Sequence, residues 1–357
     1  MKALRKKTDA AATSLGNAAA SDATAQTEST AQAATAQTTP ARPVDARKPI
    51  KVDKRIAKPS FIVANALFVL LIIAILIPGK MSTATPVPFI VVSCIIEALF
   101  LFHYLKGGAH KPATCCIVTI VYAFLIIWEV CSTDLGLTHP VLIPLPENVF
   151  NVFPTKTADL WKNVSSSLTL CCEGFISAIV VGNVLGLVVG WMPKVRETVY
   201  PVARVLAPIP AIVFTPYLIF ILPSFRLAAV FVIFLGIFWS TLMNTITRVE
   251  SMDRRIVDSA KMLGLDTKTM LLEVLVPYMY PAIAKGLKLQ LPAAMLIMVM
   301  SEMYGATSGM GYFIINYTNY ANYTNVIAGI IMIGVVVTIL DWLVSLLIKK
   351  TVKWSDQ

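Results

Sequence analysis

Apolar residues in this chain fall into runs of roughly 18 to 25 residues, and these runs restrict the possible folds more than any other feature. An α-helix rises about 1.5 Å per residue, so a run of about 20 residues crosses the ~30 Å hydrocarbon core of a bilayer. Hydrophobic residues make up 57% of the 357 positions and charged residues 14%, which is too apolar for a water-soluble surface. The sequence therefore predicts an all-α, polytopic transmembrane helical bundle.

The runs predict eight spans, and an even number returns both termini to one side of the membrane. They lie at residues 61–78, 88–105, 113–131, 168–191, 203–222, 227–246, 282–300 and 326–347. Residues 1–59 come before them and are rich in Ala, Thr, Ser and Gln, with almost no large apolar side chain before Ile50. Such a segment cannot bury enough surface to offset its chain entropy, so we expect a disordered, basic cytoplasmic tail.

The formal charge of +10 raises the alternative of a nucleic-acid partner, but the distribution of the basic residues favours membrane orientation. If the tail is inside, the cytoplasmic segments hold 23 of the 30 Lys and Arg. The positive-inside rule then predicts a multi-pass protein of the plasma (inner) membrane with both termini in the cytoplasm. It also places the polar segment 247–281 in the cytoplasm. Membrane lipid is an expected partner, and nucleic acid is not.

Segment 247–281 contains the start and stop signals of two short helices. Gly264 can take the left-handed conformation that closes a first helix, and Asp266 can cap a second. Pro277 is expected to interrupt that second helix before the membrane. Four apolar side chains are expected to form a stripe on the first helix: Ile256, Val257, Met262 and Leu263. On local physics alone, this is a structured loop between two spans.

The spacing in this segment resembles the EAA loop of binding-protein-dependent ABC importer permeases, which reads Glu-Ala-Ala, three residues, Gly, nine residues, then Ile-x-Leu-Pro. Ala260, Gly264 and Pro277 match that pattern, and the conservative departures are Asp258, Ser259, Val274 and Val276. In that family the loop is a coupling helix that sits in a cleft of a separate ATPase subunit. The resemblance implies that the ATPase-coupling residues are Asp258, Ser259, Ala260, Gly264, Val274 and Pro277.

Other segments resemble the branch of that family that carries aliphatic sulfonates, taurine, nitrate and related small anions. They are Trp128-Glu129, Ile143 to Pro146, Pro208 to Pro210, Gly286 to Lys288 and Ser301 to Tyr312. Members of this branch typically have six spans. The resemblance therefore implies a permease core at 111–357, with the coupling loop at 247–281, and two extra N-terminal transmembrane helices at 60–110.

The resemblance also implies a mechanism and a set of partners. Two permease subunits, expected to be a homodimer, would enclose a path that alternates between inward and outward access. Two ABC ATPase subunits would close on ATP and Mg²⁺ and pull on the loops, while an extracytoplasmic solute-binding protein delivers cargo to the outer loops. We expect no cofactor in this chain, which lacks a GxxxxGK[ST] phosphate loop, and no enzymatic activity of its own.

Small residues recur every four positions in the fourth predicted span, at Gly174, Ala178, Gly182, Gly186 and Gly190. Such a stripe lets another helix approach closely, within one subunit or across two, and a direct substrate role is the alternative. In the fifth span, prolines that include Pro208 and Pro210 favour a kink or a break, and that span is also a candidate wall of the path.

Ionisable residues are costly inside a span, so Glu97, Glu173, Glu302 and Asp341 deserve a functional hypothesis. Glu302 lies beside a glycine-rich turn. Because a fixed carboxylate repels anions, we expect Glu302 to organise the turn or a gate rather than to bind cargo. The candidate residues of the path or gate are Pro208, Pro210, Gln290, Glu302, Gly305, Gly309 and Gly311.

Two other classes of protein remain as alternatives. An ion-coupled secondary transporter would use intramembrane carboxylates and often shows two repeated halves, and no repeat is visible here. A membrane-embedded enzyme would need a catalytic motif, but the three histidines are scattered. The six cysteines show no metal-ligand spacing, and we expect them to be reduced, buried side chains.

Overall fold

The computed structural model describes residues 54–77, 79, 84–106, 111–137 and 139–351. The tail predicted at 1–59 lies outside these ranges except for its last six residues, which form the start of a helix. The chain divides after Lys58, and the unit Pro59–Gln357 holds nearly all of the described residues.

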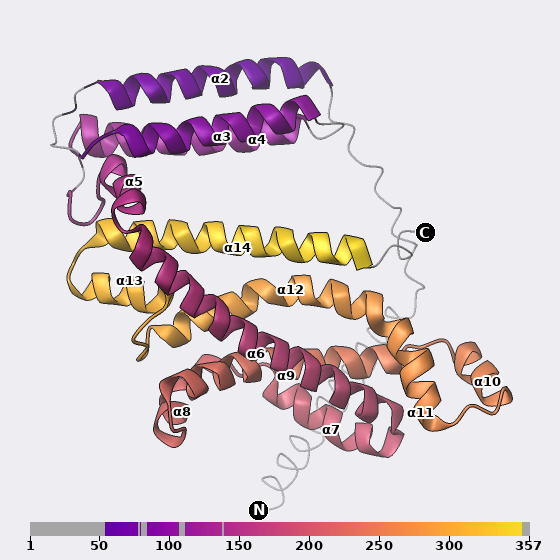
Figure 1. Ribbon diagram of the computed structural model, residues 1–357. Coiled ribbons are helices and arrows are strands. Elements are labelled where there is room, and N and C mark those ends of the chain that lie inside the picture. The colour runs from indigo at the N-terminus through magenta and orange to yellow at the C-terminus, as the bar shows by residue number, and fades with distance from the viewer. Residues whose placement is uncertain (1–53, 78, 80–83, 107–110, 138, 352–357) are drawn as a thin grey trace, which may run out of the picture. The chain divides into compact units, whose positions relative to one another are not determined.

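Within the described residues, all regular structure is helical (Figure 1). The α-helices are α2 (Lys54–Leu76), α3 (Val87–Lys106), α4 (Lys111–Glu129), α5 (Pro146–Thr155), α6 (Thr157–Trp191), α7 (Pro193–Leu206), α8 (Thr215–Ile221), α9 (Phe225–Glu250), α10 (Arg254–Met262), α11 (Thr267–Thr269), α12 (Val276–Glu302), α13 (Met310–Asn319) and α14 (Tyr323–Thr351). Two π-helical turns, η1 (Val130–Asp134) and η3 (Met270–Leu275), and one 3₁₀ turn, η2 (Ala211–Phe214), complete the set.

Seven helices in the described part of the chain are long and apolar enough to cross a membrane. An eighth span exists only if α7 and the η2–α8 segment, which are bent by 81° to each other, cross as one. The kink or break that the prolines favour within the predicted fifth span at 203–222 is therefore confirmed. Pro208 and Pro210 stand at the break, where each removes a backbone donor and a helix cannot continue unbent. The fourth span is longer than predicted, because α6 begins at Thr157 rather than near 168.

The two N-terminal helices pack beside the start of the predicted core. Phe89 of α3 stacks on Phe150 of α5, and Leu71 of α2 belongs to the same apolar cluster. Tyr122 of α4 donates a hydrogen bond to Glu97 of α3 at 2.7 Å. Helix α3 packs mainly against α4 and α5. The two N-terminal helices, α2 and α3, therefore extend the bundle at its edge.

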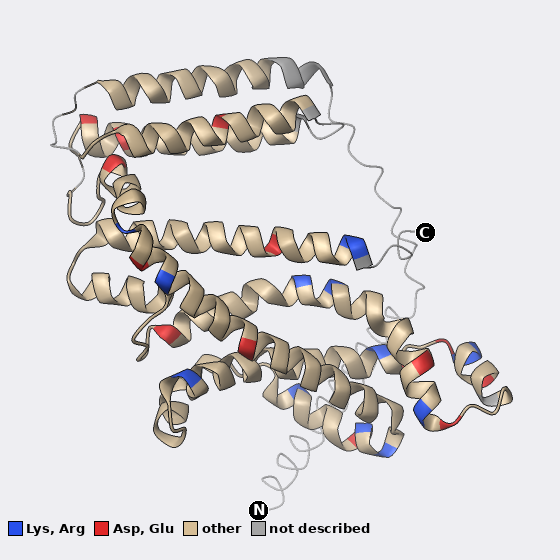
Figure 2. Cartoon of the chain, in the orientation of Figure 1, with Lys and Arg blue, Asp and Glu red and all other residues tan. Residues whose placement is uncertain are grey.

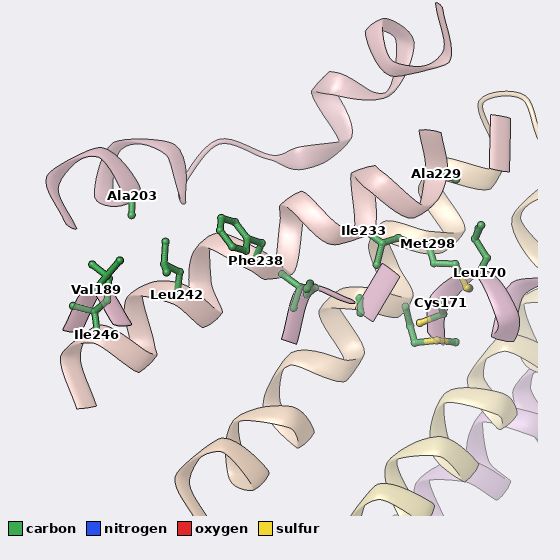
Figure 3. Packing of buried hydrophobic residues seen from close by; sticks show 14 residues of the cluster. Leu170, Cys171, Val189, Ala203, Ala229, Ile233, Phe238, Leu242, Ile246 and Met298 are labelled. Atoms are coloured by element: carbon green, nitrogen blue, oxygen red, sulfur yellow. The ribbon is translucent and has the colours of Figure 1, made fainter. Parts of the chain in front are cut away.

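The most extensive helix contact joins α6 and α9 along their lengths. Apolar side chains fill this contact together with residues of α12, and Figure 3 shows Val189 beside Ile246 and Leu170 and Cys171 beside Met298. The small-residue stripe of α6 lies in the contact. A Cβ added at Gly182 would lie 2.9 Å from the Thr241 Cβ, and one added at Gly190 would lie 2.8 Å from the Val249 Cβ. The stripe thus packs α6 on α9 within one subunit.

Replacing Gly186 by Leu should separate α6 from α9. A Cβ at this position would lie 2.6 Å from the Thr245 Cβ and 3.1 Å from the Leu242 carbonyl oxygen, and neither atom is the end of a flexible side chain. Overpacking of this kind costs roughly 1–3 kcal/mol or more. We expect a lower thermal unfolding temperature in detergent and a lower yield of folded protein. Gly334→Leu in α14 is the matched control, because a Cβ there meets nothing within 4 Å. Equal stability of the two variants would contradict the packing argument.

The cysteines differ from expectation in their burial. Cys115 and Cys171 are buried and Cys131 is half-buried, but Cys94, Cys116 and Cys172 are exposed on this single chain. Each exposed cysteine lies in a spanning helix: Cys94 in α3, Cys116 in α4 and Cys172 in α6. An exposed apolar side chain on such a helix can face lipid. The prediction of six buried cysteines is wrong for these three.

Candidate functional site

Segment 247–281 forms a compact projection between α9 and α12, with α10 at its tip. Asp253 caps α10, since its Oδ1 accepts a hydrogen bond from the Arg255 amide at 3.0 Å. Gly264 closes it with a φ of +70°, as the sequence predicts. The Leu265 amide then donates to the Ala260 carbonyl at 3.3 Å, which is the six-residue bond of a Schellman motif. Both ends of α10 are therefore defined by side-chain and backbone geometry.

One face of the projection packs against the ends of the spanning helices. Ala260 is buried in a cluster with Val249 of α9 and Met279 of α12, and Trp191 of α6 packs against the same cluster. A small residue at Ala260 lets α10 lie close to these helices. This cluster places α10 next to the ends of three spanning helices, α6, α9 and α12.

The opposite face of the projection is open. The side chains of Met262 and Leu263 are 90% and 78% exposed, and Asp258 and Ser259 are exposed beside them. Of the four residues predicted to form an apolar stripe, only Val257 packs into the cluster. The other three residues, Ile256, Met262 and Leu263, are exposed, so most of these apolar side chains lie at the surface of this chain.

The second helix of the projection differs from expectation at Pro277. Asp266 is its N-cap residue, but its carboxylate accepts a hydrogen bond from the Thr269 hydroxyl rather than a capping bond from the backbone. That hydroxyl is the main reason why the pKa of Asp266 is lower than usual. Pro277 does not interrupt the helix, because the wider π-helical turn η3 precedes it and α12 continues from Val276. Val274 is half-buried and Pro277 is exposed.

Glu302 holds the glycine-rich turn at the other end of α12. Its side chain is 1% exposed, and its Oε2 accepts hydrogen bonds from the Gly311 amide at 2.8 Å and from the Ser167 hydroxyl at 2.9 Å. Gly309 has a φ of +122°, and a Cβ there would collide with the Glu302 carboxylate. Glycine is required at this position by both the backbone angle and the space.

Two residues of α6 complete the clamp on this turn. The Asn163 Oδ1 accepts a hydrogen bond from the Gly309 amide at 2.9 Å, and the Ser167 Oγ accepts one from the Met310 amide at 2.8 Å. Neither residue was singled out from the sequence, since they lie over 140 positions from the turn and nothing local indicates the pairing. Gly305 is exposed and packs near Phe225.

Gln290 lies in a separate polar seam in the middle of the bundle. The Thr241 hydroxyl of α9 donates to the Gln290 Oε1 at 2.9 Å, and the Thr245 hydroxyl donates to the Asn183 Oδ1 of α6 at 2.9 Å. Twelve residues of α12 separate Gln290 from Glu302, which is a distance of about 18 Å along the helix. The structure therefore does not bring these two candidates together.

Pro208 and Pro210 are exposed at the break between α7 and η2. After the break, Ala211 lies close to α9. A Cβ added at Gly236 of α9 would lie 3.3 Å from the Ala211 Cβ. The chain is thus folded onto α9 and α12 at this point. The two prolines shape this approach, and they lie apart from the Glu302 turn.

The four carboxylates that the sequence analysis singled out in the spans all have structural partners. Arg226 donates two hydrogen bonds to Glu173, and Lys288 lies 3.7 Å from Asp341. Sequence reasoning missed two further buried carboxyl groups, Glu129 and Glu147, which are 0% and 2% exposed. Glu147 accepts a hydrogen bond from the Thr133 hydroxyl at 3.2 Å, whereas neither Glu129 oxygen has a partner among the described residues.

Comparison with known proteins identifies relatives for most of this chain. Residues 182–353 match the family described as "Binding-protein-dependent transport system inner membrane component". A protein named as an aliphatic sulfonates transport permease, SsuC, of Bacillus subtilis is 26% identical over 64% of this chain and 84% of its own length. The taurine transport system permease protein TauC of Escherichia coli is 24% identical over 69% and 92%, and the nitrate import permease protein NrtB of Leptolyngbya laminosa is 26% identical over 70% and 92%.

Among solved structures, a chain of the MetNI methionine ABC transporter in an inward facing conformation is 16% identical, with a TM-score of 0.46. It covers 54% of this chain and 94% of its own length.

Proposed function

We propose that this chain is the transmembrane permease subunit of an ATP-driven importer. Its residues 182–353 match the family of inner membrane components of binding-protein-dependent transport systems. The cargo is a small anion such as a sulfonate, taurine or nitrate. Two copies enclose the path, a separate ABC ATPase with ATP and Mg²⁺ supplies the energy, and an extracytoplasmic solute-binding protein delivers the cargo.

The observation that carries this proposal is the two-faced projection between α9 and α12. Its inner face is packed through Ala260 against the ends of three spanning helices, and its outer face presents Met262 and Leu263 to solvent. Exposed apolar side chains on a rigid, capped helix are typical of a docking surface. An ATPase bound there would transmit its movement to the spans without first having to order the loop.

The charge distribution supports a cytoplasmic position for this projection. Figure 2 shows Lys and Arg on α7, α10 and α11 and at the end of α14, whereas most of the length of the spanning helices carries no charge. These basic residues include Lys194, Arg254, Lys268 and Lys349. By the positive-inside rule, the end of the bundle that carries α7, α10, α11 and the last turn of α14 faces the cytoplasm.

The proposal for the cargo rests on the relatives, which are named for transport of sulfonates, taurine and nitrate. An ion-coupled secondary transporter would need intramembrane carboxylates. The four singled out from the sequence are engaged by other residues, whereas the buried Glu129 carboxyl group has no partner among the described residues. Glu173 and Asp341 form ion pairs, and Glu302 accepts hydrogen bonds from Ser167 and Gly311.

Reconstitution tests the class of transporter. The permease, together with the ABC ATPase and solute-binding protein encoded beside it, is placed in proteoliposomes, and uptake of labelled taurine, ethanesulfonate and nitrate is measured. We expect uptake of one of these anions only with ATP and with the ATPase present. Uptake that a proton or sodium gradient drives without the ATPase would overturn the proposal in favour of a secondary transporter.

A further inference from the structure

Two carboxyl groups are buried together where α4 ends and α5 begins. Glu129 is the last residue of α4, and Glu147 lies in the first turn of α5. Both side chains are buried, and the charged groups that act on Glu129 are Glu147 and Asp134. The Thr133 hydroxyl of the intervening turn η1 donates its hydrogen bond to Glu147. Two acids therefore face each other beneath the surface of the bundle.

Packing on both sides fixes this arrangement. The Trp128 indole N–H donates a hydrogen bond to the Pro144 carbonyl at 3.0 Å, which brings the segment before α5 against the end of α4. Residues 144–147 are all buried. On the other side, Phe150 of α5 stacks on Phe89 of α3. These contacts keep both carboxyl groups away from bulk water.

Neither acid forms an ion pair within the described ranges of the chain. Neither Glu129 oxygen has a hydrogen-bond donor there. The charged side chains nearest along the neighbouring helices are engaged elsewhere, since Glu97 of α3 accepts a hydrogen bond from α4 and Lys156, nine residues after Glu147, donates one to Tyr317. The negative charge of the two acids is therefore not balanced by the side chains that surround them.

A single proton resolves this arrangement. Two buried carboxylates side by side repel each other and lack the solvent that would screen them, so one of them takes up a proton. A protonated carboxyl group carries an O–H donor, which supplies the hydrogen bond that the Glu129 oxygens otherwise lack. Glu147 can accept it beside the bond from Thr133, because a carboxylate has about four acceptor positions. Asp134 is only half-buried, so it can remain ionised through its contact with solvent.

A divalent metal cation fits this site less well than a proton does. Cations such as Ca²⁺ and Mg²⁺ take about six or more oxygen ligands, several of them commonly from carboxylates. Among the residues that the structure describes, no group of three or more His, Cys, Asp and Glu side chains is arranged to hold a metal ion. A shared proton needs only two carboxyl oxygens that face each other.

We propose that Glu129 and Glu147 form a proton-binding site in which one shared proton joins α4 to α5. The end of α4 that carries Glu129 is extracytoplasmic in the proposed topology. Val149 of α5 belongs to the same apolar cluster as Met310 of α13, directly after the Gly305–Gly311 turn begins to fold back. Loss of the proton would leave two like charges between α4 and α5, so this end of the bundle becomes less stable as the pH rises.

Thermal unfolding of the full chain in detergent tests the site between about pH 6 and about pH 9. The folded pair holds a proton that the unfolded chain releases, so stability falls as the pH rises. Glu129→Gln removes the charge and puts an N–H donor in place of the O–H donor. Over this range we expect the unfolding temperature of the wild type to fall by about 3 °C or more relative to that of Glu129→Gln.

The matched control is Glu173→Gln, which alters an exposed carboxylate that pairs with Arg226 and should keep the wild-type pH dependence. Identical pH profiles for the wild type and Glu129→Gln would overturn the inference. So would a rise in the unfolding temperature of the wild type, but not of Glu129→Gln, when Na⁺ or Ca²⁺ is added at constant ionic strength, because the pair would then hold a cation instead.

Infrared difference spectra identify the bound proton independently of stability. A protonated carboxyl group has a carbonyl band of its own, and we expect the wild type at neutral pH to show one such band that both Glu129→Gln and Glu147→Gln lose. If neither variant loses a band, the pair holds no proton and the inference fails. Both measurements use the permease alone. If a proton gradient drives uptake without the ATPase, the proposed function fails and this proton site stands.

Discussion

Replacing Gly264 by Val should abolish ATP-driven uptake while the chain still inserts and folds. Gly264 closes α10 with a φ of +70°, and a β-branched residue is strongly disfavoured in that conformation. The loss has no steric component, since a Cβ at Gly264 meets nothing within 4 Å. The bond from the Leu265 amide to the Ala260 carbonyl would be lost, and with it the orientation of Met262 and Leu263. Co-purification with the ATPase and uptake in proteoliposomes measure the effect.

The matched control for this variant is Gly264→Asn, because asparagine tolerates the left-handed region better than other residues with a side chain. We expect Gly264→Asn to retain most ATPase association and Gly264→Val to retain less than a tenth. If Gly264→Val binds the ATPase as well as the wild type does, the rigid α10 is not the docking element. A variant that leaves the backbone intact, Met262→Asp, should also weaken association by placing a charge on the exposed apolar face.

Replacing Glu302 by Leu should release the turn from Gly305 to Gly311 and reduce uptake at least tenfold. The substitution removes the acceptor for the buried Gly311 amide and for the Ser167 hydroxyl. An unpaired buried donor costs about 1–3 kcal/mol, which is enough to shift the turn to another conformation. Because the α6–α9 contact does not involve this side chain, the bundle should remain folded. Labelling of a cysteine introduced by Ser308→Cys reports the release as faster modification.

Two further variants separate the clamp from simple loss of charge. Glu302→Gln retains one carbonyl oxygen, so we expect an intermediate loss of uptake. Glu173→Gln removes a half-exposed carboxylate that pairs with Arg226, and exposed pairs contribute little, so uptake should change less than twofold. Wild-type uptake in Glu302→Leu would show that the turn does not form part of the gate.

Much of the α10 segment could be predicted from the sequence, because its helix signals are local. Gly264 was predicted to close the helix and does so, whereas the Asp253 cap at its start was not singled out, although its contact is only two residues away. Local signals also misled at Pro277, because the sequence pattern does not distinguish a helix that stops from one that passes a proline through a π-helical turn. In the fifth span the local signal was informative, because prolines that include Pro208 and Pro210 predicted a kink or a break and the helices on either side are bent by 81°.

The sequence by itself determined that this is a helical membrane protein, where most of its spans lie and that Gly264 closes α10, because hydropathy, helix periodicity and capping act over short stretches of chain. Only the tertiary structure decided which residues work together. Ser167 donates a hydrogen bond to Glu302 across 135 positions, and Arg248 of α9 and Lys285 of α12 line one cavity. Those pairings depend on how α6, α9 and α12 pack against one another, and packing depends on the fit of many distant side chains at once.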